Sequence, residues 1–492
     1  MSNAGNLPAY TQPQSVFMLS LASNALFFQT GTQAELQAAI GQFLRGYQPG
    51  SPPPSGPAPF FKALNTPNPT YPSLAGGDWS TVWGPFVYCE MDGLIQINPG
   101  ATNMMFVAHS PSQNMYVVAI AGTNPTGWSA GTIEDLEVGP NSMVAWPPVL
   151  GDIPLVNTDK LQWTPLPSPS ADRPAIDAGT SAGMDVLYGM VCPYSGLRLV
   201  DFLDPKNPKG THSQNGQTIV FTGHSLGGAL APTLAMLLYP MAAKAGTPAK
   251  RAPNPNASQW QNVYIIATAG PTPGNAGFAS LFYTPVTVPP LPNISPAPVT
   301  VPYPPAALTL TGISGNYMPV ATGDTAASGG VWPLMYWNMD YANVYDVVPR
   351  AWTLLANLVA QPTATSNGYY PSFFANGASL SGSSNTLGIP SVGDFAYGLI
   401  GKLSGLAGYQ GNITPFYTQC LMHFPVNGTW GSWAKGQPYP QAFMDEATPT
   451  TFQTFGDLSK YILDAHLDQY SRALLGYPGL TIGQAVPAVG GL

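Results

Sequence analysis

The pattern Gly-x-Ser-x-Gly occurs three times in this sequence and marks the serines that could act as nucleophiles. A serine hydroxyl can attack a carbonyl carbon when it is exposed on a tight strand-to-helix turn, where flanking glycines relieve crowding. The bare pattern also arises by chance in a glycine-rich chain, so the flanking residues must decide among the copies. The copies span residues 127–131, 179–183 and 223–227, and are centred on Ser129, Ser181 and Ser225.

Only the copy centred on Ser225 has the flanks that such a turn requires. Residues 218–222 before it form a short run typical of a buried strand, and apolar residues follow it at helical spacing. The copy at Ser129 follows Asn124-Pro125, outside any strand, and the copy at Ser181 follows a poor strand over residues 173–177. We therefore predict Ser225 as the nucleophile. The apolar residues that follow it are Ala229, Leu230, Leu234, Leu237 and Leu238.

A serine nucleophile needs an imidazole to accept its proton and a carboxylate to orient that imidazole. When the serine lies on a strand-to-helix turn, the acid and then the histidine follow it in the chain. His109 and His212 come too early and His224 is adjacent to the serine, which leaves His423 and His466. We prefer His466, because it lies near the chain end after a helical run from which a late loop could return to the turn. We expect His423 to pack within an insertion.

Asp346 is the predicted acid. It follows a strand-like run over residues 336–345 and precedes Val-Val-Pro, which should end the strand and begin a loop. The rival Asp340 is expected inside that strand, and Asp464 is too close to His466 in sequence to be an easy partner. A turn aspartate that caps the next segment is the alternative explanation for Asp346.

The anionic oxygen of a tetrahedral intermediate needs two backbone N–H donors. One should come from Leu226, the residue after the nucleophile, and the other from the loop that follows an earlier strand. Thr123 ends the run Val-Ala-Ile-Ala-Gly-Thr and fits that place, and its hydroxyl could add a third donor. An ordinary threonine at a strand end is the alternative.

Several segments must position these residues. Residues 102–109 and 114–121 predict a hairpin, residues 218–222 and 262–268 predict buried strands, and residues 180–191 predict a helix. Thr32 and Glu35 form a capping-box pattern at the start of another helix. Pro232 lies inside the helix expected after Ser225, where proline costs about 3 kcal/mol, so we expect a kink or a helix tightly tied to the sheet.

Strands that alternate with helices predict an α/β fold with a mostly parallel central sheet flanked by helices. We interpret residues 1–492 as one domain with large irregular insertions. Its catalytic core covers about residues 80–280, 330–360 and 450–480. Residues 1–80 form an N-terminal extension, and the insertions cover about 282–330 and 360–450.

The composition excludes some classes of function. Charged residues make up 8% of the chain, and a net charge of −8 with 15 Lys and Arg argues against nucleic-acid binding. Cys89, Cys192 and Cys420 have no metal-type spacing, and we expect buried thiols. No apolar run is long enough to span a bilayer, and no basic region precedes the apolar residues 16–28, so we recognise no signal peptide and leave the compartment open. We expect no cofactor and no metal.

Together these segments resemble the class 3, or fungal-type, lipases of the α/β-hydrolase superfamily. The matching parts are residues 119–125, 218–238 with GHSLGGAL, 269–275, 343–349 and the late pair His466 and Tyr470. The resemblance covers a little over half of the chain and implies the α/β-hydrolase fold. It also implies Thr123 in the oxyanion hole, Ser225 as nucleophile, Asp346 as acid and His466 as base. Ala121 departs from the family, which usually has arginine there, so a charged support for that loop is missing.

The resemblance implies a serine carboxylic ester hydrolase, with a triacylglycerol lipase or esterase as the main hypothesis and a lipid–water interface as its place of action. A phospholipase A1, a polyester or aryl esterase and a catalytically dead binding protein remain alternatives. Two apolar segments, residues 143–150 and 395–409, are candidate lids, or each simply covers core. Activity should fall below about pH 6–7, because an imidazolium cannot accept the serine proton. The oligomeric state is left open.

Overall fold

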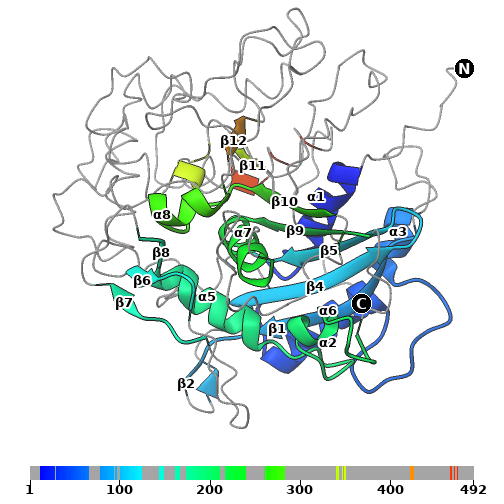
Figure 1. Cartoon of the computed structure of the whole chain (residues 1–492). Coiled ribbons are helices and arrows are strands. Elements are labelled where there is room, and N and C mark those ends of the chain that lie inside the picture. The colour runs from blue at the N-terminus through cyan, green and yellow to red at the C-terminus, as the bar shows by residue number, and fades with distance from the viewer. Residues whose placement is uncertain are drawn as a thin grey trace, which may run out of the picture.

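A mostly parallel sheet lies at the centre of the computed structural model (Figure 1). The structure describes residues 12–27, 29–65, 78–92, 95–96, 100–122, 124, 143–148, 161–166, 173–210, 217–239, 260, 262–282, 339–342, 346, 348–350, 422–425, 466–467, 470 and 474. Within these residues the sheet has seven strands in the order β1-β4-β5-β9-β10-β11-β12. They are β1 Ser80–Tyr88, β4 Asn103–Ser110, β5 Met115–Ile120, β9 Thr218–His224, β10 Asn262–Thr268, β11 Met339–Ala342 and β12 Met422–Pro425.

Among the seven described strands of this sheet, β4 alone runs opposite to the others. β1, β4 and β5 are antiparallel neighbours, whereas β5, β9, β10, β11 and β12 run parallel to one another. The hairpin that we predicted over residues 102–121 is the pair β4 and β5. Parallel strands need crossover connections, which place helices on the faces of the sheet. The α/β-hydrolase fold expected from the sequence is confirmed.

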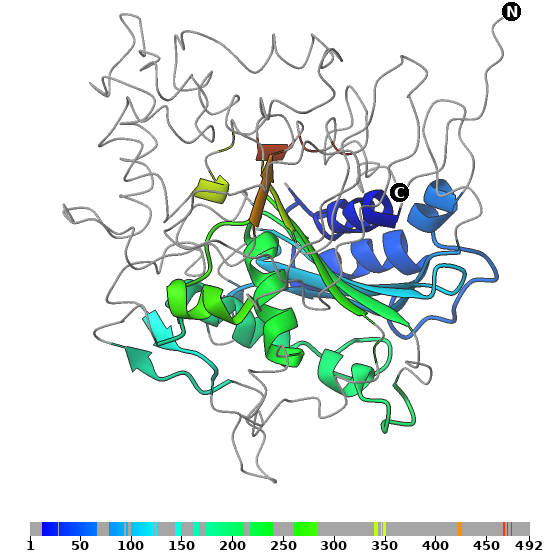
Figure 2. The same ribbon diagram turned by 45° about the horizontal axis from the view of Figure 1, so that its top comes forward.

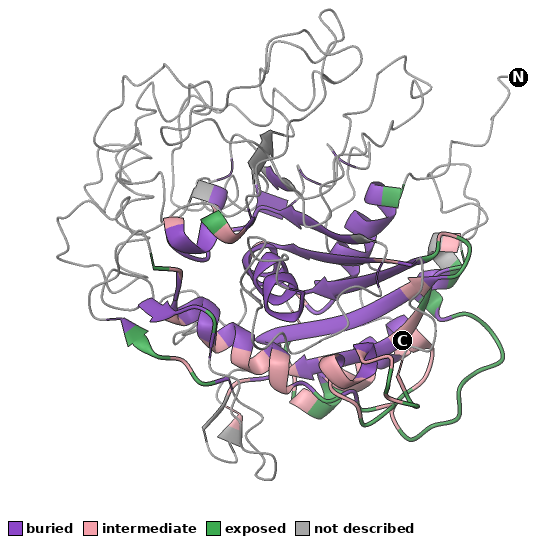
Figure 3. Ribbon diagram, viewed as in Figure 1, coloured by how far each residue is buried: buried purple, intermediate pink, exposed green. Residues whose placement is uncertain are grey.

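Helices cover both faces of the sheet (Figure 2). α1 (Gln12–Ser23) and α2 (Gln33–Arg45) lie on one face, and α5 (Ala178–Gly189) and α7 (Leu226–Leu238) lie on the other. Val117 and Ala119 of β5 belong to the apolar cluster that includes α1 and α2, whereas Val118 and Ile120 belong to the cluster that includes α7. Successive side chains of a strand point to opposite faces, so a continuously apolar strand such as β5 fits between two helical layers. Figure 3 shows the result as a buried central sheet.

The capping box at Thr32 is present as predicted. Glu35 N donates to Thr32 Oγ1 at 3.3 Å and Thr32 N donates to Glu35 Oε2 at 2.8 Å, which satisfies two N–H groups at the start of α2. Gly46, with φ 77°, ends the helix. α2 therefore forms from local signals, and Leu36, Ile40, Phe43 and Leu44 bury its apolar face.

Helix α7 contains Pro232 and continues through it to Leu238. All its residues are buried, so apolar burial offsets the cost of about 3 kcal/mol that proline imposes inside a helix. Of the two outcomes expected for Pro232, a kink or a helix held tightly against the sheet, the second describes α7.

Two segments that we had set apart as additions belong to this architecture. Helix α1, from the N-terminal extension, is buried at eleven of its twelve positions. Residues 422–425, which we expected inside an irregular insertion, form β12 beside β11, with His423 in register with Asp340. The expectation that His423 packs within an insertion is therefore wrong, because its backbone is part of the central sheet. The apolar run Leu-Met-His-Phe had the character of a short strand, but its partner is distant in sequence.

The remaining described elements surround this core. The chain between β5 and α5 forms a three-stranded sheet of order β7-β6-β8. This sheet includes part of the first candidate lid, because Met143 lies in β6, is 1% exposed and packs with Leu166 and Ala175. The second candidate lid lies outside the described residues. The other elements are α3 Pro59–Asn65, β2 Met91–Asp92, β3 Ile95–Gln96, β6 Met143–Ala145, β7 Pro165–Leu166, β8 Ala175–Asp177, α6 Leu199–Leu203, α8 Ala276–Ala279 and the short 3-10 helices Ser280–Phe282 and Val348–Arg350.

The structure also bears on membrane spans, metal sites and cysteines. Among the described residues, none of the helices has the length and apolarity needed to cross a membrane. The same part of the chain contains no group of three or more His, Cys, Asp or Glu side chains arranged to hold a metal ion. Cys89 and Cys192 are buried free thiols, and burial raises the pKa of Cys89 to about 11; Cys420 lies outside the described residues.

Candidate active site

Ser225 lies at the turn between β9 and α7. Its φ of 59° and ψ of −131° are unusual for a residue with a side chain, and such strained backbone is concentrated at functional sites. Ser225 N donates to Thr268 O at 3.0 Å, which holds the turn against β10, and Gly228 N donates to Ser225 O at 2.7 Å within the turn. The side chain is partly exposed at the end of the parallel strands. This is the strand-to-helix geometry that we predicted for the third copy of the serine pattern.

The glycines of this copy allow three backbone segments to meet. A Cβ atom at Gly223 would lie 2.1 Å from Gly227 O, and one at Gly227 would lie 2.3 Å from Ile120 O at the end of β5. Real Cβ atoms essentially never approach other atoms so closely, so both positions require glycine. The same contacts bring the end of β5 next to Ser225.

Ser181, the rival in the second copy, lies in a different environment. It is in the first turn of α5, where Asp177 caps the helix by accepting from Thr180 N at 2.6 Å. Its hydroxyl donates to Ala178 O at 2.8 Å, and the residue is 6% exposed. Helix α5 begins at Ala178, two residues before the predicted start, because of this cap. Ser129 lies outside the described residues.

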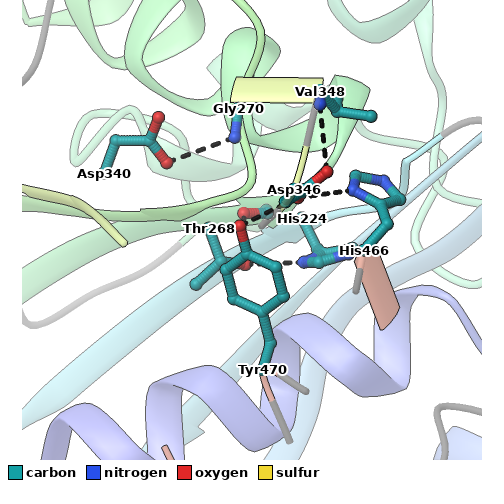
Figure 4. A network of polar contacts seen from close by, with 9 residues as sticks. His224, Thr268, Gly270, Asp340, Asp346, Val348, His466 and Tyr470 are labelled. Atoms are coloured by element: carbon teal, nitrogen blue, oxygen red, sulfur yellow. Dashed lines mark hydrogen bonds and ion pairs between the residues drawn. The ribbon is translucent and has the colours of Figure 1, made fainter. Parts of the chain in front are cut away.

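Asp346 and His466, which are 120 positions apart, form a buried hydrogen-bonded pair (Figure 4). His466 Nδ1 lies 2.8 Å from Asp346 Oδ2, and the two residues are 7% and 1% exposed. An ionised carboxylate can only accept, so the Nδ1 atom carries the proton in this pair. The lone pair of Nε2 is then free to accept a proton from another group.

Asp346 accepts two further hydrogen bonds. Tyr470 OH donates to Oδ2 at 2.9 Å and Val348 N donates to Oδ1 at 2.9 Å. Three donors fix the position of the carboxylate. Tyr470 follows His466 by four positions, and both side chains bond to the same oxygen of Asp346. Residues four positions apart can share one helical face, so the spacing relates Tyr470 to His466 in the sequence, and the bond to Asp346 is a tertiary contact.

His466 lies beside the Ser225 turn. The ring of His466 is 4.9 Å from that of His224, the residue before Ser225, with an angle of 40° between the ring planes. In the described part of the chain no hydrogen bond joins the Ser225 hydroxyl to the His466 ring. Such contacts are often long without substrate and shorten when a complex forms.

His224 is a fully buried histidine at this site. Its Nδ1 lies 2.9 Å from Thr268 Oγ1, and the edge of its ring meets Tyr470 at a centroid distance of 5.1 Å. Burial lowers the pKa of His224 well below its ordinary value, and the nearby His466 adds to this shift, whereas a contact with the His466 backbone opposes it. Burial therefore favours the neutral form of His224 in the folded protein.

The lowered pKa of His224 predicts a loss of stability in acid. A group that binds a proton more weakly when folded stabilises the protein above its unfolded pKa, about 6.5 for histidine, and this contribution is lost as the pH falls further. The free energy of unfolding, measured by denaturant titration between pH 5 and 8, should therefore decrease below about pH 6.5. We expect a flatter dependence for His224→Asn than for the wild type. His109→Asn is the comparison: that ring is half-buried and burial lowers its pKa too, so this variant should flatten the dependence less than His224→Asn does. Equal slopes for wild type and His224→Asn would contradict the prediction.

Leu226 and Thr123 are the residues that we predicted to form the oxyanion hole beside Ser225. Leu226 is the first residue of α7 and is 4% exposed, and the first N–H groups of a helix have no partner within it. Thr123 lies outside the described residues, but its neighbour Gly122 is described. A Cβ atom at Gly122 would lie 2.8 Å from Ser225 Cβ and 2.5 Å from His224 O. The loop that contains Thr123 therefore approaches the serine at Gly122.

The rival acid Asp340 has another partner. It lies in β11 and accepts from Gly270 N at 3.2 Å, in the loop after β10 (Figure 4). Asp464 and His212 lie outside the described residues. Of the aspartates and histidines considered in the sequence analysis, Asp346 and His466 are the pair that the described part of the structure brings together.

Comparison with known proteins supports a lipase-type core. Residues 203–287 match the family model described as Lipase (class 3), a span that includes β9, Ser225, α7 and β10. This match confirms the resemblance over those residues and supports ester hydrolysis of the lipase type. A search of curated protein sequences gives no match.

Several solved structures of lipases are similar to this chain. M37 lipase has 21% sequence identity and a TM-score of 0.48, with 95% of this chain and 93% of that chain covered. The lipase from Rhizopus microsporus var. chinensis has 14% identity and a TM-score of 0.31, with coverages of 71% and 75%. Lip2 lipase from Yarrowia lipolytica has 14% identity and a TM-score of 0.31, with coverages of 70% and 76%.

Proposed function

We propose that this chain is a serine ester hydrolase that cleaves triacylglycerols and related carboxylic esters through an acyl-enzyme on Ser225. The observation that carries the proposal is the meeting of two features at one end of the sheet. One is a serine in strained backbone at a strand-to-helix turn, and the other is a histidine beside that turn whose Nδ1 is bonded to a buried carboxylate. This constellation is the one that serine hydrolysis needs.

In the proposed reaction, Ser225 Oγ attacks the ester carbonyl carbon while His466 Nε2 accepts the hydroxyl proton. Asp346 stays ionised and stabilises the imidazolium through Nδ1–H. The carbon–oxygen bond to the alcohol then breaks, the alcohol oxygen takes the proton from His466, and the acyl group remains on Ser225. A water molecule repeats the sequence on the acyl-enzyme, with His466 again as base, and releases the carboxylic acid.

The oxyanion of both tetrahedral intermediates is assigned to the backbone N–H groups of Leu226 and Thr123, with the Thr123 hydroxyl as a third donor. The start of α7 supports the assignment of Leu226, because the helix dipole also favours negative charge there. The approach of Gly122 to Ser225 supports the assignment of Thr123. Removal of one such donor typically costs about 10²–10³ in kcat.

Lipid esters are the proposed substrate class because residues 203–287 match a lipase family. Phospholipids, aryl esters and polyesters would use the same catalytic groups. Rates over a series of acyl chain lengths, with and without an emulsified interface, separate these substrates. A rise in rate at the interface with long acyl chains is the result expected of a lipase.

Covalent labelling with a fluorophosphonate tests the proposed nucleophile. The native protein should react at one position, and mass spectrometry of the digested protein should find the adduct on the peptide that contains Ser225. The denatured protein is the control, since its serine lacks an aligned base and should not react. An adduct on Ser129 or Ser181, or no adduct on the native protein, would contradict the proposal; the last result is the one expected of a catalytically dead binding protein.

A further inference from the structure

Asn24, from the N-terminal segment, reaches the loop beside Ser225. It follows helix α1 directly and is 2% exposed. Gly122 N donates to Asn24 Oδ1 at 2.8 Å, a buried contact between residues 98 positions apart. Gly122 is also the residue whose Cα approaches Ser225 so closely that no side chain fits there.

The amide of Asn24 is itself held in one orientation. Its Nδ2 donates to Ser20 O in the last turn of α1 at 2.9 Å, so the Oδ1 atom must face Gly122. Helix α1 is fixed in turn, because Val16, Phe17 and Leu21 are fully buried in the apolar cluster that includes β5 and β9. Asn24 therefore connects a rigid layer of the core to the loop.

A second amide holds the other side of the same loop. Asn124 is 4% exposed, and its Nδ2 donates to Leu26 O at 3.1 Å and to Gln29 O at 3.4 Å. The segment from Asn24 to Gln29 thus binds the loop at both residues that flank position 123.

We propose that Asn24 is a positioning residue for the oxyanion hole, which it supports by holding Gly122 against the Ser225 turn. This inference rests on the proposed function. An oxyanion donor contributes most when it is already in place as charge develops on the substrate oxygen, so a loosened loop lowers transition-state stabilisation. Ground-state binding of the ester depends little on the same contact.

The test compares kinetics of Asn24→Leu with those of the wild type. Leucine has a similar volume and no acceptor for Gly122 N–H. We expect kcat to fall about 10- to 100-fold, below the range for loss of a donor itself, with KM changed less than about twofold. The inhibition constant of a trifluoromethyl ketone, which forms a tetrahedral adduct with an oxyanion, should rise by a similar factor.

Two controls separate positioning from folding. Rates are expressed per site titrated with a fluorophosphonate, so that misfolded protein does not count, and Asn24→Ala is measured in the same way because it adds no bulk. Ser23→Ala is the matched variant: Ser23 is also buried and its hydroxyl donates to Ser20 O, but Gly122 N bonds to Asn24 instead. The variant removes the 3.4 Å contact from Asn24 Nδ2 to Ser23 Oγ and leaves the shorter bond from Nδ2 to Ser20 O in place. Its kcat should stay near that of the wild type.

The inference fails if both Asn24 variants keep kcat and the inhibition constant within twofold of the wild type. It also fails if Ser23→Ala, which keeps the bond from Gly122 N to Asn24 Oδ1, loses as much activity as they do. A wild-type protein that neither hydrolyses esters nor reacts with the fluorophosphonate would instead overturn the proposed function.

Discussion

Replacing Ser225 by alanine is expected to lower kcat for ester hydrolysis by about 10⁶-fold. The alanine variant has no hydroxyl to form the acyl-enzyme, and loss of the serine in a serine hydrolase costs roughly that factor. What remains comes from the oxyanion donors and substrate binding, which still act on a direct attack by water. Initial rates on a soluble ester and on an emulsified one, with the fold monitored by circular dichroism, measure the effect.

Ser181→Ala is the matched control for this variant. Ser181 has the same Gly-x-Ser-x-Gly pattern, but it lies within α5 and its hydroxyl donates to Ala178 O. We expect kcat to stay within about twofold of the wild type. Activity that survives Ser225→Ala and is lost in Ser181→Ala would refute the assignment of the nucleophile.

Replacing Asp346 by asparagine is expected to lower kcat by about 10⁴-fold. Asparagine is nearly isosteric, but its uncharged amide neither stabilises an imidazolium nor requires the proton to be on Nδ1. The oxygen that replaces Oδ1 or Oδ2 can still accept from Tyr470 or Val348, so the loop after β11 should keep its fold. The effect should appear mainly in kcat, because the imidazolium forms only as the reaction proceeds.

Asp340→Asn is the control that shows whether the loss of any buried carboxylate lowers kcat or only the loss of the charge at Asp346. Asp340 is also 1% exposed, and an asparagine oxygen can accept from Gly270 N as the carboxylate does. Its kcat should change by less than about threefold. Comparable losses in the two variants would mean that Asp346 has no special role as the orienting acid.

The local turn at Ser225 was predictable from the sequence for a physical reason. A strand, two glycines and an apolar helix over residues 218–238 are encoded by neighbouring residues, through alternation, steric freedom and helical spacing. The capping box of α2 is local in the same sense, since Thr32 and Glu35 bond to each other's backbone. Signals of this kind need no knowledge of distant segments.

Asp346 and His466 were chosen by their order in the chain, and their hydrogen bond is a fact of the tertiary structure. The sequence indicated that a late histidine could return to the turn. It did not indicate that Tyr470 would donate to the same carboxylate or that burial would lower the pKa of His224, because both depend on how β9 and the residues around Asp346, His466 and Tyr470 pack together.

The sequence by itself determined the nucleophilic turn, the class of fold and the types of residue that could complete a site. Only the tertiary structure decided that residues 422–425 extend the central sheet and that the N-terminal segment reaches the loop at Gly122. The physical reason is range: periodicity, capping and turn preferences act over a few residues, whereas a contact across 98 positions forms only when the core brings α1 and the end of β5 together.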